Sequence, residues 1–201
     1  MIKNLDLQLS LFSAEVDPKK KEQIFLAQKL SMEDVVKKEL ILKKQSDSYV
    51  RGFIDTLYRM LSNNTISWKD RNGTNIALST TGSTQSISLG SSNQAVAIDD
   101  YYVASLIASG TAAGQLIYGV TNNTQYGSSG VYTIGSSRVQ LCTAPFVNMS
   151  GDNVVIEEVC LFGGQYSGNW YYFTHARDLT GTITLNDGQA IVVEYRHSVT
   201  V

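Results

Sequence analysis

Histidines and cysteines are the residues of this chain best suited to bind a metal or to act as nucleophiles. His175 and His197 are its two histidines, and Cys142 and Cys160 are its two cysteines. Structural zinc sites draw four ligands from closely spaced pairs, and these four residues lack that spacing. We therefore expect no metal and no cofactor, with both histidines in strands and both cysteines as buried free thiols. A disulfide would require that the two cysteine strands be neighbours.

Two pairs of adjacent carboxylates could suggest acid and base catalysis. They are Asp99 with Asp100 and Glu157 with Glu158. Neighbouring residues of a strand point to opposite faces, so neither pair delivers both carboxylates to one substrate, as a glycosidase would require. We expect one member of each pair to face solvent and the other to cap, to pair with an arginine or to lie at an edge. No catalytic residue is predicted, and we do not expect an enzyme.

Basic residues offer two further interpretations. Arg177 and Asp178 end an aromatic segment, and a structural role, in which Arg177 bridges to an acidic residue or to carbonyls, is favoured over a binding role. Lysine runs at 19–21, 37–38 and 43–44 could contact nucleic acid, but no aromatic residues lie among them for base stacking. A solvated face or a contact with an acidic partner is therefore preferred.

Charge is distributed unevenly along the 201 residues. Thirteen of the 16 Lys and Arg residues precede Asn72, together with 10 of the 18 acidic residues, so the first part carries +3 and the rest −5. From Asn72 the composition changes to Ser, Thr, Gly and Asn. We place a boundary near 62–73, with a helical arm over 1–62 and a second domain over 72–201.

The arm is expected to begin with a strand and to continue with helices. Leucines alternate with polar residues near the N-terminus, which predicts a half-buried strand with no hairpin partner in sequence. This strand should pair either with a distant edge of its own sandwich or with another subunit, and another subunit is favoured. Asp17 and Pro18 indicate a helix to about Leu30, and Ser31 indicates a second over about 31–44. A third helix over about 46–61 shows an apolar stripe. The candidate contacts between subunits are Leu5, Leu7, Leu9, Leu11, Val50, Phe53, Ile54, Leu57, Tyr58 and Leu61.

The second domain reads as a series of short strands separated by turns. The last three, at 154–162, 170–176 and 190–201, are expected to form a β-meander, with the final strand fully paired. Earlier strands are expected at 76–78, 85–89, 101–108, 115–120, 131–134 and 138–146. The predicted fold is mainly β, α+β overall, with an N-terminal helical arm followed by an antiparallel β-sandwich.

Three segments carry a resemblance to a known group of proteins. A hydrophobic strand ends in Phe162 and Gly163, an aromatic strand ends in Ala176, Arg177 and Asp178, and a turn ending in Gly188 and Gln189 precedes an alternating strand. This pattern, over roughly 86–201, resembles a β-sandwich of virion structural proteins of tailed bacteriophages. It implies a sandwich fold and a structural role in a phage particle.

The resemblance leads us to expect a non-enzymatic virion subunit, most simply a neck or tail ring, adaptor or head-tail connector that assembles as a homo-oligomer. Its partners would be other copies and neighbouring portal, tail or capsid proteins. The alternatives are a capsid vertex, fibre-base or decoration protein and a carbohydrate-binding β-sandwich that uses Tyr166, Trp170, Tyr171 and Tyr172. No signal peptide or membrane span is apparent, so we expect synthesis in the host cytoplasm and a place in the virion.

Overall fold

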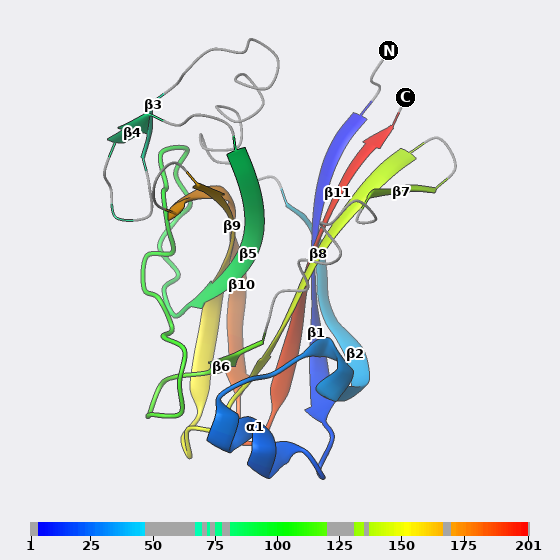
Figure 1. The fold of residues 1–201 in the computed structure, drawn as a ribbon, viewed down its shortest axis with the longest axis vertical. Coiled ribbons are helices and arrows are strands. Elements are labelled where there is room, and N and C mark those ends of the chain that lie inside the picture. The colour runs from blue at the N-terminus through cyan, green and yellow to red at the C-terminus, as the bar shows by residue number, and fades with distance from the viewer. Residues whose placement is uncertain are drawn as a thin grey trace. The chain divides into compact units, whose positions relative to one another are not determined.

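The described residues of the chain form two antiparallel sheets and one short two-stranded sheet. The structure, a computed structural model, describes residues 4–46, 67–69, 72, 75–77, 81–119, 131–134, 137–166 and 170–200. Its strands are β1 (Asn4–Val16), β2 (Val35–Ser46), β3 (Ser67–Lys69), β4 (Asn75–Ala77), β5 (Thr81–Gly90), β6 (Ile117–Tyr118), β7 (Val131–Ile134), β8 (Ser137–Val147), β9 (Val154–Tyr166), β10 (Trp170–Leu185) and β11 (Ala190–Thr200). The helices are α1 (Lys21–Ala27) and the 3₁₀ turn η1 (Met32–Asp34). The mainly β prediction is confirmed (Figure 1).

Contacts divide the chain into two compact units. Unit 1 comprises Met1–Ser46, Ile107–Ile156 and Thr182–Val201, and unit 2 comprises Asp47–Leu106 and Glu157–Gly181. The larger sheet, in the order β2-β1-β11-β8-β6 with β7 also on β8, belongs to unit 1. The first 46 residues therefore share a unit with the C-terminal strand and do not form a separate arm. Packing of the two sheets as a sandwich stays a prediction.

The predicted N-terminal strand is confirmed as β1, and it finds both of its partners within the same chain. It runs antiparallel to β11 from Asn4 to Ala14 and antiparallel to β2 on its other side. Leu7, Leu9 and Leu11 are at most 1% exposed. A missing partner was the reason to place these leucines between subunits. Pairing within the chain corrects that expectation, and for Leu5 the described pairing is with Val199.

The second predicted helix is wrong, because residues 35–46 form β2. Ser31 does begin a helical turn, since the Asp34 carboxylate accepts hydrogen bonds from the Ser31 amide and hydroxyl at 2.8 Å each. That turn ends after Asp34. The β-branched and aliphatic side chains that follow suit a strand, and the open edge of β1 supplies a ladder that a helix would leave unpaired. The third predicted helix lies outside the described residues, with Val50, Phe53, Ile54, Leu57, Tyr58 and Leu61.

The last three strands are present, but they do not form the predicted meander. β10 belongs to the second sheet, in the order β10-β9-β5, whereas β11 lies in the first sheet between β1 and β8. The final strand is therefore fully paired, with Ile191, Val193 and Tyr195 buried and Glu194 half-buried. The strand predicted at 101–108 is also wrong, because this segment is irregular apart from isolated bridges.

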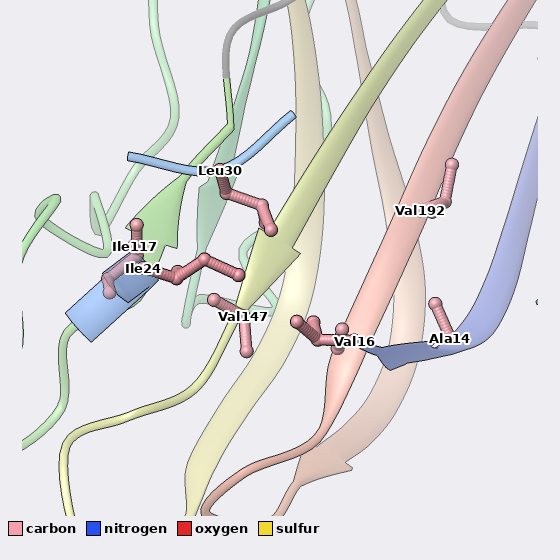
Figure 2. Packing of buried hydrophobic residues seen from close by; sticks show 8 residues of the cluster. Ala14, Val16, Ile24, Leu30, Ile117, Val147 and Val192 are labelled. Carbon is pink, nitrogen blue, oxygen red and sulfur yellow. The ribbon is translucent and has the colours of Figure 1, made fainter. Parts of the chain in front are cut away.

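Short elements cover part of one face of the unit 1 sheet. Ile24 of α1 and Leu30 pack with apolar side chains of β1, β8 and β11 (Figure 2). The cluster consists of Ala14, Val16, Ile24, Leu30, Ile117, Val147, Ala190 and Val192. α1 is shorter than predicted and ends at Ala27, because the next residue, Gln28, has a left-handed φ of 47° that stops the helix. Burial of these side chains anchors the segment between β1 and β2.

Candidate functional site

A buried arginine organises the strongest polar cluster in unit 2. Arg177 lies on β10, is 1% exposed, and donates from Nε to Oε2 of Glu158 on β9 at 2.6 Å. Its Nη1 donates to Oδ2 of Asp100 at 2.7 Å. Burial lowers the pKa of Arg177, but hydrogen bonds and charge from Asp100 and Glu158 outweigh it, so the pKa is raised above its ordinary value. The guanidinium is therefore charged at any working pH.

Backbone groups complete the cluster. Arg177 also donates to the carbonyls of Gln94 at 3.0 Å and Ala95 at 3.4 Å. Glu158, which is fully buried, accepts from the amides of Ala104 at 3.1 Å and Ser105 at 2.9 Å. These amides are in the segment predicted to be a strand. A carboxylate, in place of a neighbouring strand, satisfies them, which explains why the segment is irregular.

The cluster fixes the segment 91–106, which we call the clamped loop. Inside it, Asp100 accepts from the Ala97 amide at 2.8 Å and its own amide donates to the Ala97 carbonyl at 3.1 Å. The loop base is closed by a 2.9 Å bond from the Ser91 amide to the Ser105 carbonyl. Beneath it Gly90 leaves room for the Glu158 carboxylate, with which a Cβ would overlap. The loop is held at its base and at its tip.

The clamped loop presents apolar side chains to solvent. Ile98 is 60% exposed, Leu106 46% and Tyr101 38%. An ordered loop with exposed apolar side chains can bind a partner without first losing conformational entropy. By contrast, four hydrogen bonds to groups of its own chain occupy most of the five N–H groups of Arg177. The arginine therefore positions the loop, and the loop surface is the candidate site.

The other residues singled out from the sequence lie in separate places. Cys142 and Cys160 are buried thiols outside any disulfide, on β8 and β9 respectively, as predicted. Burial raises the pKa of the Cys160 thiol to about 12. His197 on β11 is 9% exposed, and burial lowers its pKa to about 4. Within the residues that the structure describes, no three His, Cys, Asp or Glu side chains gather as metal ligands.

Arg177 makes structural contacts of the kind that the sequence predicted, and one carboxylate of each adjacent pair meets an arginine, as expected. Arg177 bridges to acidic residues and to carbonyls, and Asp178 beside it is fully buried. Glu158 is the buried member of its pair and Glu157 is half-buried. The specific contacts of Arg177 with Glu158 and Asp100 were not predicted from the sequence. A signal was present, because Arg177 is one of only three arginines after Asn72.

No protein-family model, no curated protein and no solved structure matches the chain. None of the helices described is long and apolar enough to cross a membrane.

Proposed function

We propose that the chain is a non-enzymatic structural subunit of a tailed-phage virion, a neck or tail ring, adaptor or connector that assembles through the clamped loop. The observation that carries the proposal is the use of a buried arginine and two carboxylates to hold a loop with an exposed apolar tip. A loop that is already ordered loses less conformational entropy when its exposed apolar side chains pack against a neighbouring subunit. The mainly β fold is compatible with the resemblance that suggested a virion protein.

The carbohydrate-binding alternative receives less support. Of its four candidate aromatic side chains, Tyr172 is half-buried and packs edge-on against Phe162 with ring centroids 5.7 Å apart. A stacking platform for a sugar requires a ring face open to solvent. The side chains of Tyr166, Trp170 and Tyr171 lie outside the described residues.

A substitution at the loop tip tests the assembly role. Ile98→Asp should leave the circular dichroism spectrum unchanged, because Ile98 is 60% exposed, and should lower the mass of the assembled protein measured by light scattering. Leu26→Asp is the matched control, since Leu26 is 74% exposed on α1 of the other unit. Cryo-electron microscopy of intact particles would then locate the protein. A monomeric wild-type protein that is absent from particles would refute the proposal.

A further inference from the structure

The outer edge of β2 is the second surface of the molecule with the properties of a binding site. Among the described residues β2 pairs with β1 alone and ends the unit 1 sheet (Figure 1). The N–H and C=O groups on the outer side of such a strand can pair with another extended chain. The ladder with β1 shifts register between Leu11 and Phe12 and between Glu15 and Val16, so residues 37–40 form the regular stretch between the two irregularities.

The side chains of β2 are unusually apolar for an exposed edge. Val36 is 59% exposed, Leu40 52% and Ile41 47%. The strand also carries four lysines against one glutamate, for a net charge of +3. Two β2 strands paired with each other would bring lysines together, which is destabilising. The charge therefore disfavours a second β2 and favours an acidic partner.

A cavity lies beside this edge within unit 1. Its volume is about 510 Å³, a size typical of small-ligand sites. Lys37, Glu39 and Ile41 of β2 line it at every second position, and Ile183 and Leu185 of β10 line it from elsewhere in the unit. A strand added to β2 would direct every second side chain to this side of the sheet. The cavity has room for those side chains.

Charge differs between the two sides of β2. The cavity wall is balanced, with Lys21 and Lys37 against Glu15 and Glu39, and Lys37 pairs with Glu15 at 3.2 Å. On the other side of the sheet Lys38 lies over the Phe12 ring, 4.1 Å from its centroid, and its Nζ is 3.9 Å from Oε2 of Glu194. Lys43 is exposed and pairs in register with Ser10, so it shares that side. An added strand would therefore meet a charge-balanced cavity of mixed polar and apolar lining on one side. On the other side it would meet Lys38 and Lys43, whose two charges exceed the one charge of Glu194.

We propose that β2 binds an extended acidic segment of a partner protein by strand addition. The segment pairs its backbone with residues 37–40, places alternate apolar side chains in the cavity beside Ile41 and Ile183, and places carboxylates near Lys38 and Lys43. The outer edge of β2 is a different surface from the clamped loop. Peptide binding at β2 can therefore be shown or refuted independently of the proposed virion role.

A synthetic peptide tests strand addition to the full-length protein. The probe is a short acetylated and amidated peptide in which valine alternates with Asp and Glu, and its affinity is measured by isothermal titration calorimetry. We expect affinity to fall with added salt, and to fall at least about tenfold when alternate backbone nitrogens on one edge are methylated, because the ladder hydrogen bonds are lost. Hydrogen exchange at 37–40 should slow when the unmodified peptide binds.

Matched charge reversals test the location. Lys38→Glu combined with Lys43→Glu should weaken binding about tenfold, whereas Lys19→Glu with Lys29→Glu, which changes net charge equally at exposed positions away from β2, should not. Equal loss in both variants, equal affinity for the methylated peptide, or no binding at ~1 mM peptide would overturn the proposal. The proposal would also be overturned if the protein self-associates and only the Lys38→Glu, Lys43→Glu variant loses this self-association. The segment bound at β2 would then be a second copy of the same chain.

Discussion

At the scale of single residues, Arg177 and Glu158 form a buried ion pair in unit 2. Arg177 and Glu158 are 1% and 0% exposed and meet at 2.6 Å, and Asp100 and backbone groups make further hydrogen bonds to the pair. Removing one partner of such a pair leaves an uncompensated buried charge, which costs more than the pair contributes. The exposed pair of Lys37 and Glu15 has no such cost, since water solvates either charge alone.

Arg177→Met should therefore lower the free energy of unfolding by about 3–5 kcal/mol, because Glu158 would be left buried without its partner. Urea denaturation followed by circular dichroism measures the change. Lys37→Met is the control, for which we expect at most about 1 kcal/mol. Equal effects of the two substitutions would show that the buried cluster does not stabilise the fold.

His197 should make stability depend on pH. Its folded pKa, about 4, lies below the ordinary value of 6.5, so the unfolded chain takes up a proton first as the pH falls. The stability is complete above pH 6.5 and is lost toward pH 4. Between about pH 7 and about pH 5 the loss should be about 2 kcal/mol. His197→Gln should reduce this slope in urea titrations, and an unchanged slope would contradict the assignment.

At the scale of elements, β1 is central to unit 1. It lies between β2 and β11, and Leu9, directly opposite Tyr195, is fully buried. Burial of its leucines and pairing of both edges act together, since a strand with unpaired buried backbone would be costly. Loss of packing in β1 should therefore weaken both of its neighbours.

Leu9→Ala should cost about 2–5 kcal/mol of unfolding free energy, from lost burial and from the cavity left behind. Leu26→Ala removes the same atoms from a side chain that is 74% exposed, and should change stability by less than about 0.5 kcal/mol. Chemical denaturation of the two variants under identical conditions makes the comparison. Similar effects would mean that β1 is not packed as described.

At the scale of the whole molecule, one sheet joins the two ends of the chain. β1 from the N-terminal region is hydrogen-bonded to β11 from the C-terminal region, over the register from Asn4 with Thr200 to Ala14 with Ala190. If residues 1–62 were a helical arm, their removal would leave a separate sandwich intact. Removal of β1 instead exposes the backbone edge of β11 together with an apolar face, and should destabilise the sheet.

A chain that begins at residue 72 should therefore be insoluble or should lack native structure. Amide hydrogen exchange on the full-length protein gives a second measurement, since β11, paired on both sides, should exchange more slowly than the edge strand β2. A soluble fragment with a native-like circular dichroism spectrum would support the separate arm that the charge distribution suggested.

The sequence by itself determined those features that depend on local pattern. Alternating leucines predicted β1, and turn residues between β-branched runs predicted β8, β9 and β11 to within a few residues. The apolar surroundings of Cys142 and Cys160 predicted buried thiols. Each of these signals lies within a few residues of the feature that it specifies.

Only the tertiary structure decided how these pieces pair. The Ser31 cap is real, yet β1 offered the next residues a ladder, so β2 is a strand. β10 and β11 are neighbours in sequence but belong to different sheets. Glu158 satisfies amides of Ala104 and Ser105, more than 50 residues away, and so determines a loop where propensity favoured a strand. In each case a distant hydrogen-bonding partner outweighed local preference, because buried backbone groups must be paired wherever the partner lies in the sequence.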